Sequence, residues 1–134
     1  MTSTANTQFL RRVLLLDAGV SAAAGLLMAF GGQFLAPLTG LSADLLIPAG
    51  LILSPYAGLV AWVATRASPP TALVWTVIGA NVLWAADSVA LILFGWAQPT
   101  LLGHVFVIGQ AAVVALFAEL QLIALRKART PVAA

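Results

Sequence analysis

The chain has 134 residues, of which 62% are hydrophobic and only 7% are charged, and its mean hydropathy is +1.06. Soluble domains carry about a quarter charged residues, so this composition excludes an ordinary soluble protein and is typical of an integral membrane protein. The length allows about four membrane-spanning helices of ~20 residues with short connections. We therefore expect one integral membrane domain over residues 1–134.

Four apolar segments follow one another along the chain, and each is long enough to span a bilayer. The first covers residues 9–31 and precedes the turn-forming stretch "GGQFLAPLTGLS". The second covers residues 44–66, and "ASPPT" separates it from the third, at residues 71–96. The fourth covers residues 100–126 and follows "GWAQPT". Because the connections are short, we predict an all-α fold, a four-transmembrane-helix antiparallel bundle.

Basic residues predict how this bundle is oriented. All of them fall on one side of the predicted bundle, whereas Asp44 is the only charge in the loops on the other side. The positive-inside rule therefore places both termini in the cytoplasm, with residues 1–7 and 128–134 as flexible tails. The basic residues are Arg11, Arg12, Arg66, Arg126, Lys127 and Arg129.

Two further expectations concern the membrane and the first segment. Five arginines against one lysine, with abundant alanine, favour a bacterial protein of the inner (cytoplasmic) membrane. A cleaved signal peptide is the alternative interpretation of the first segment, because Arg11 and Arg12 precede an apolar run and the small residues "SAAAG". Asp17 would interrupt such a run, so we favour a helix that is retained.

Small residues at steps of four predict close helix packing. On a helix this spacing forms one face, and in lipid small side chains let two helices approach closely. Asp17 begins the first of these stripes, and Glu119 ends the last. The small members are Ser21 and Gly25 in the first segment, Gly50, Ser54 and Gly58 in the second, and Ala111 and Ala115 in the fourth.

Asp17 and Glu119 are the carboxylates that raise a functional question. An aspartate facing lipid near a helix centre costs about 2.5–3.5 kcal/mol, so we expect Asp17 to face other helices. If the first and fourth helices are neighbours, Asp17 and Glu119 could approach each other and share a proton or hold a cation. In the alternative interpretation, each carboxylate pairs with a basic residue near the same surface: Arg11, Arg12, Arg66 or Arg126.

The third and fourth segments carry further polar groups. Asn81, Trp84, Asp87 and Ser88 cover one arc of the third helix, and we expect Asp87 to pair with Gln110. Such a pair is either an interhelical hydrogen bond or a ligand contact.

The fourth helix is predicted to have two polar faces. Gln110 and Gln121 share one face, whereas Glu119 lies roughly opposite Gln110. A single bundle interior cannot satisfy both faces. We therefore expect a homo-oligomer or a larger membrane complex.

Three aromatic side chains are candidates for lining a ligand pocket. Tyr56 follows Pro55 and carries a hydroxyl that needs a partner. Trp84 is predicted to be buried, whereas Trp62, Trp75 and Trp96 are typical interfacial anchors. His104, the only histidine, is expected to form a hydrogen bond at headgroup level, with a proton or quinone-headgroup role as the alternative.

No catalytic motif is present, so we predict that the protein is not an enzyme. With no cysteine and one histidine we expect no metal and no cofactor, and the few basic residues predict no nucleic-acid binding. The expected function is an accessory, assembly or structural subunit that acts through helix packing in the bilayer. The alternative is a small homo-oligomeric transporter or channel, coupled to protons or cations through its intramembrane carboxylates.

Overall fold

The computed structural model describes residues 2–129, with side chains from residue 5 to residue 128, and contains four helices and no strand in that range. The helices are α1 (Thr2–Thr39), α2 (Ala43–Ala64), α3 (Thr71–Leu93) and α4 (Leu101–Arg129). Each is long and apolar enough to cross a membrane. The predicted all-helical class with four possible spans is therefore confirmed.

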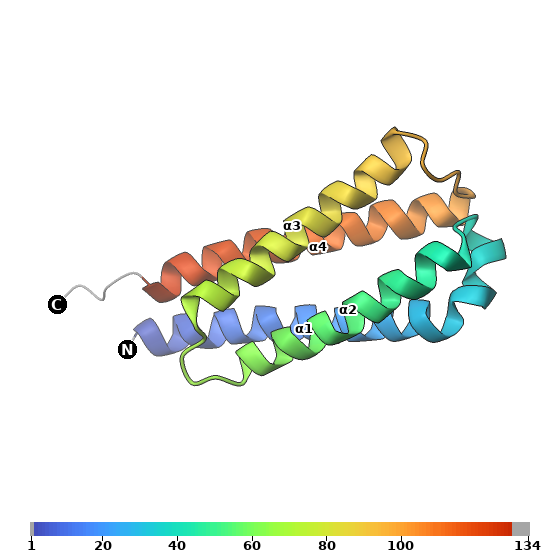
Figure 1. The fold of residues 1–134 in the computed structure, drawn as a ribbon. Coiled ribbons are helices and arrows are strands. Elements are labelled where there is room, and N and C mark those ends of the chain that lie inside the picture. The colour runs from blue at the N-terminus through green and yellow to red at the C-terminus, as the bar shows by residue number, and fades with distance from the viewer. Residues whose placement is uncertain (1, 130–134) are drawn as a thin grey trace.

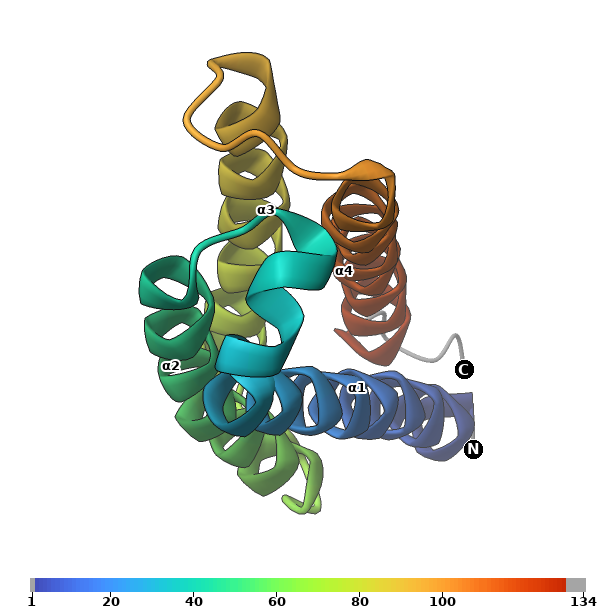
Figure 2. The ribbon, with the colours of Figure 1, turned by 90° about the vertical axis from the view of Figure 1, so that its right-hand side faces the viewer.

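α1 is longer than its predicted span at both ends. It includes residues 2–7, which belong to the predicted flexible tail, and Asn6 Nδ2 donates to the carbonyl of Lys127 at 3.1 Å. At its other end α1 continues past Gly31 and Gly32 and bends, so that its last turns lie across the bundle (Figures 1 and 2). The remaining residues of the predicted tails, 1 and 130–134, lie outside the described range.

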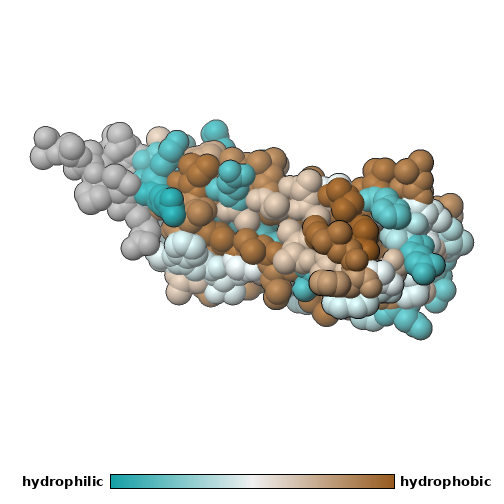
Figure 3. Space-filling view, turned by 90° about the horizontal axis from the view of Figure 1, so that it is seen from above, coloured by the Kyte–Doolittle hydropathy of each residue, from teal (hydrophilic) through white to brown (hydrophobic). Residues whose placement is uncertain are grey.

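The bundle has two distinct ends. The start of α1, the α2–α3 loop and the end of α4 lie together (Figure 1). We call this the basic end, because it carries the described basic side chains, and we call the opposite one the far end. Polar residues gather toward both ends in Figure 3, and the surface between them is mostly apolar. The basic side chains are Arg11, Arg12, Arg66, Arg126 and Lys127.

The four helices are not packed equally tightly. α1 packs along α2 and α4, and α3 packs along α4, whereas α2 and α3 make the weakest contact among the four pairs of neighbouring helices. Figures 1 and 2 show α3 diverging from α2 toward the far end. One side of the bundle, between α2 and α3, is therefore much looser than the other three.

Hydrogen bonds at both ends hold the loops in place. At the far end, Thr100 donates its N–H to the carbonyl of Thr39 at 2.9 Å and its hydroxyl to that of Leu38 at 2.7 Å. At the basic end, Arg11 Nη2 donates to the carbonyl of Arg66 at 3.1 Å. These bonds join the end of α1 to the start of α4, and the start of α1 to the α2–α3 loop.

A close helix contact joins α1 to α2 at two glycines. A Cβ atom added to Gly50 would meet the backbone nitrogen of Ala29 and would lie 2.6 Å from the carbonyl oxygen of Gly25. Ser54 lies one turn further along α2 and donates its hydroxyl to the carbonyl of Gly50 at 2.8 Å. Only residues without a side chain allow the two backbones to come this close.

Not all the predicted small residues take part in packing. Gly58 is exposed, and a Cβ atom added to it would meet no neighbouring atom within 4 Å. Ala115 is also exposed on α4, whereas Ala111 is buried. These two positions therefore form no helix interface within the described part of this chain. Within this chain the Gly58 and Ala115 positions face outward.

Two apolar clusters fill the interior. One lies toward the basic end around Leu14, Val63 and Val77, and the other lies toward the far end around Met28 and Leu46. Tyr56 is the partly buried side chain that packs against both clusters. Asp17 and the polar side chains that bond to it lie between the two clusters.

The glycine contact predicts different effects for two matched substitutions in α2. Gly50→Ala forces α1 and α2 apart, and we expect it to lower the free energy of unfolding by about 1–3 kcal/mol. Gly58→Ala is the control and should be neutral or stabilising by up to about 1 kcal/mol, because alanine favours helix. Unfolding in mixed micelles measures both. Equal effects of the two substitutions would contradict the assigned contact.

Candidate functional site

Asp17 is the centre of a buried group of polar side chains. Its side chain is 0% exposed, and its Oδ1 atom accepts a hydrogen bond from Ser21 Oγ at 3.0 Å. Its Oδ2 atom accepts from Tyr56 Oη at 3.0 Å, Asn81 Nδ2 at 2.8 Å and Gln121 Nε2 at 2.6 Å. Each of the four helices therefore contributes to the group, which we call the polar cluster.

Further hydrogen bonds join the partners of Asp17 to one another. Asn81 Nδ2 also donates to Gln121 Oε1 at 3.0 Å, and Tyr56 Oη lies 3.1 Å from Asn81 Oδ1. The hydroxyl of Tyr56 has one hydrogen but two acceptors within reach, Asp17 Oδ2 and Asn81 Oδ1. Its orientation must therefore follow the protonation state of the cluster.

The polar cluster can hold one additional proton without moving its heavy atoms. An ionised Asp17 only accepts hydrogen bonds, so Tyr56 donates to it. A protonated Asp17 donates its O–H to the oxygen of Tyr56, whose hydroxyl then turns to Asn81 Oδ1. In both arrangements the two amides continue to donate toward Asp17. The geometry is thus compatible with both protonation states of the carboxyl group.

The partners of Asp17 differ from both interpretations of the sequence. Among the described residues no basic side chain forms an ion pair with Asp17, and Arg11 instead bonds to the carbonyl of Arg66. Glu119 is exposed on α4 and does not approach Asp17. The physical reason is helical geometry: Gln121 faces Asp17, and Glu119, two residues earlier, is rotated by about 200°.

A cavity of about 310 Å³ adjoins the polar cluster, and we call it the central cavity. Ser21, Tyr56 and Asn81 belong to its wall, so the cavity touches three of the four partners of Asp17. Ile52 of α2 and Leu83 of α3 also line it and are both well exposed. The central cavity therefore reaches the surface between α2 and α3, on the loose side of the bundle.

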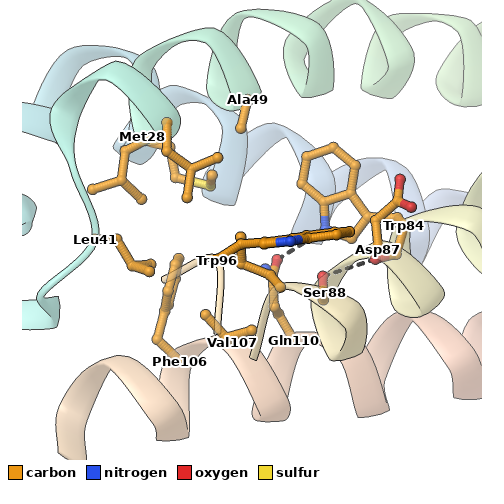
Figure 4. A pocket seen from close by; sticks show the side chains of 13 residues that line it. Met28, Leu41, Ala49, Trp84, Asp87, Ser88, Trp96, Phe106, Val107 and Gln110 are labelled. Carbon is orange, nitrogen blue, oxygen red and sulfur yellow. Dashed lines mark hydrogen bonds between the residues drawn. The ribbon is translucent and has the colours of Figure 1, made fainter. Parts of the chain in front are cut away.

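A second cavity, of about 280 Å³, lies toward the far end, and we call it the far-end cavity (Figure 4). Most of its wall is apolar and includes Met28, Phe106 and Val107. Trp84 and Asp87 of α3 line both cavities. These two side chains therefore mark the boundary between the cavities.

The predicted pair of Asp87 and Gln110 is not formed. Gln110 Oε1 instead accepts a hydrogen bond from the indole nitrogen of Trp84 at 3.2 Å (Figure 4). Asp87 is exposed and lines the same cavity as Gln110. Trp84 lies one turn before Asp87 on α3, and its longer side chain extends to Gln110 on α4.

Two other candidates lie apart from the polar cluster. His104 is exposed at the start of α4, where its Nδ1 atom lies 3.0 Å from the carbonyl oxygen of Thr100. It lines neither cavity. Glu119 also lines neither cavity and lies on the outer face of α4.

Sequence reasoning missed Gln121 as a partner of Asp17. Depth along the helices is a partial signal, since each predicted helix has at least one polar residue five to ten positions from the predicted cytoplasmic side, but in the fourth helix both Glu119 and Gln121 meet this criterion. Asp17 is five residues after Arg12, Tyr56 ten before Arg66, and Gln121 five before Arg126. Asn81 follows Thr71, the first residue of the third predicted helix, by ten positions.

No family model matches the chain, and neither curated proteins nor solved structures show a significant match. In the part of the chain that the structure describes, no group of three or more histidine or carboxylate side chains could hold a metal ion. The site is therefore defined by its own chemistry. It consists of a buried carboxyl group with uncharged hydrogen-bond donors beside an apolar cavity.

The geometry predicts that Asn81 stabilises the bundle more than a buried serine of the same helix. Asn81→Leu removes one of the donors to Asp17 Oδ2 and the donor to Gln121 Oε1, and we expect a loss of about 3 kcal/mol in the free energy of unfolding. Ser88→Ala is the control. The Ser88 hydroxyl bonds only to the carbonyl of Trp84 in its own helix, so its loss should be below about 1 kcal/mol. Comparable losses in both variants would refute the central role of the polar cluster.

Proposed function

We propose that the protein is a small multi-pass membrane transporter that couples the movement of a solute to the protonation of Asp17. One observation carries the proposal: a fully buried carboxyl group is bonded to uncharged donors on all four helices and lies beside a cavity. Ionisable groups inside membrane proteins commonly mark proton or ion pathways. This interpretation corresponds to the transporter alternative from the sequence.

In the proposed setting the four helices cross the inner membrane of a bacterium as an antiparallel bundle. The basic end faces the cytoplasm, because positively charged residues are enriched on that side of membrane proteins. The far end then faces the opposite side. Tyr56 and Asn81 lie near the middle of α2 and α3, which puts the polar cluster deep in the bilayer.

Coupling is supported by the route between the cavity and Asp17. Asp17 does not line the central cavity, but Tyr56 does, and its hydroxyl bonds to Asp17. A proton can therefore pass from the cavity to Asp17 through Tyr56. Protonation of Asp17 changes the hydrogen bonds of Tyr56 on α2 and Asn81 on α3: Tyr56 then accepts a hydrogen bond from Asp17 and donates one to Asn81. These two helices flank the cavity, and their mutual contact is the weakest among neighbouring helices.

A second function, that of an accessory or assembly subunit, is favoured by Glu119. This carboxylate is exposed about 10 Å along the axis of α4 from Arg126, within the apolar span. Ala115 and Leu116 beside it are exposed as well. A carboxylate facing lipid is costly, and contact with another transmembrane helix would lower that cost. The two functions are compatible, since transporters also assemble.

Asp17→Asn is the decisive substitution for the transport proposal, because asparagine fits the polar cluster without a titratable group. Its oxygen can accept the bonds now made to Oδ2, and its amide can donate to the hydroxyl of Ser21. We expect a folded protein that no longer moves protons. The measurement uses proteoliposomes with an imposed pH gradient, an internal pH-sensitive dye, and added hydrophobic cations, neutral solutes or anions in turn.

The wild type should dissipate the gradient with at least one of these solutes, and Asp17→Asn should match empty liposomes. Glu119→Gln and Asp44→Asn are the matched controls and should keep the wild-type rate, because both carboxylates lie outside the cavities. A folded wild type that dissipates the gradient with none of the solutes would count against transport. An Asp17→Asn variant that dissipates the pH gradient at the wild-type rate would also count against transport.

The assembly function predicts a separate effect of Glu119. If another helix covers this carboxylate, Glu119→Gln weakens a charge-assisted contact, and we expect a smaller oligomeric fraction in native mass spectrometry of gently extracted membranes. Gln98→Glu, at an exposed position in the α3–α4 loop, controls for a change of charge alone. An unchanged oligomer distribution in Glu119→Gln would remove the support for this function.

A further inference from the structure

Trp84 and Asp87 lie at the boundary of two cavities, which makes the pair the natural place for a ligand. We infer that the two cavities form one binding site for a hydrophobic organic cation, with the positive group at Asp87 and the apolar part in the far-end cavity. The inference deepens the proposed transport function by naming the substrate class, and it rests on that function for the step that follows binding.

The charge of the ligand follows from Asp87. Its carboxylate is one of the few polar groups in the walls of the two cavities, and no hydrogen bond or ion pair joins it to any described side chain. In mostly apolar surroundings an unpaired carboxylate is unfavourable, and a bound cation removes that penalty. An anionic ligand would increase it.

The other residues that line the cavities favour binding of an organic cation over binding of a metal ion. Asp87 is the single carboxylate among the residues that line the two cavities, and Gln110 and Ser88 beside it are uncharged. A metal ion would therefore find one carboxylate where it needs several oxygen ligands. A weakly hydrated organic cation needs fewer, because it gains from the carboxylate and from apolar contact.

The indole of Trp84 provides a second contact for the positive group. Its N–H is held by Gln110, which fixes the orientation of the ring in the wall of both cavities (Figure 4). Cations bind over aromatic faces, and tryptophan is the strongest of the three aromatic residues in this role. Met28, Phe106 and Val107 then offer an apolar surface to the rest of the ligand.

The position of the site also fits a hydrophobic cation. Ile52 and Leu83 line the central cavity at exposed positions, so the cavity reaches the surface between α2 and α3 rather than at an end of the bundle. In the proposed membrane setting this surface faces lipid. A ligand that partitions into the bilayer can therefore reach Asp87 from the side, whereas a strongly hydrated cation cannot.

Binding of benzyltrimethylammonium and of its uncharged carbon isostere, neopentylbenzene, tests the inference. The two probes have nearly the same shape and differ in charge. The full chain carries Trp62→Phe and Trp75→Phe, so that its tryptophans are Trp84 and Trp96, which both line the far-end cavity. The tryptophan fluorescence of this chain in lipid nanodiscs is titrated with each probe, with empty nanodiscs as the blank.

We expect saturable binding of the cation that Asp87→Asn weakens by about tenfold or more, because the ion contact is lost. Binding of neopentylbenzene should be the same with and without Asp87→Asn. Asp44→Asn removes a carboxylate at the start of α2 that lines neither cavity, and it should affect neither probe. Equal cation affinity in Asp87→Asn and its parent would overturn the inference, as would equal affinity for the two probes in the parent.

Failure of this inference can be distinguished from failure of the proposed function. If Asp17-dependent proton movement occurs with another class of solute and benzyltrimethylammonium does not bind, only the assigned substrate class is wrong. If benzyltrimethylammonium binds through Asp87 but no solute produces Asp17-dependent proton movement, the binding site stands and transport fails.

Discussion

The bundle depends on satisfying one carboxyl group in an interior where none of the described basic side chains reaches it. On insertion scales a central aspartate costs about 2.5–3.5 kcal/mol, and one interhelical hydrogen bond in a membrane contributes about 0.6–2 kcal/mol. The three bonds from Tyr56, Asn81 and Gln121 together are of the same order as that cost. Because each bond comes from a different helix, Asp17 fixes the depth and rotation of α2, α3 and α4 relative to α1.

Of the four contacts between neighbouring helices, three are tight and one is loose. Gly25 and Gly50 bring α1 and α2 together, and Thr100 ties the start of α4 to the end of α1. α3 lies along α4, whereas α2 and α3 separate toward the far end. Both cavities lie on this loose side, and the polar cluster forms the inner wall of one of them. The most tightly satisfied group of the protein therefore borders its least packed region.

The sequence predicted the four helices and the shared basic end, because both depend on local composition. It also predicted that Asp17 faces other helices. It could not predict the partner, since that depends on how α4 is rotated and how far it slides along α1. Gln121 and Glu119 are two residues apart, so only one of them can face Asp17. Gln121 does so, and Glu119 is therefore exposed on the outer face of α4. Likewise, Gln110 bonds to Trp84 rather than to Asp87 because of side-chain length, which a periodicity argument does not include.

The wide spacing of the polar cluster along the chain has a consequence for how the protein is made. Asp17 meets Ser21 within its own helix, but Asn81 and Gln121 follow 64 and 104 residues later. When α1 leaves the ribosome, two of the four side chains that bond to its carboxylate have not been synthesised. Although α1 is the first helix of the chain, its carboxylate therefore gains its full set of partners only after α4 has been synthesised.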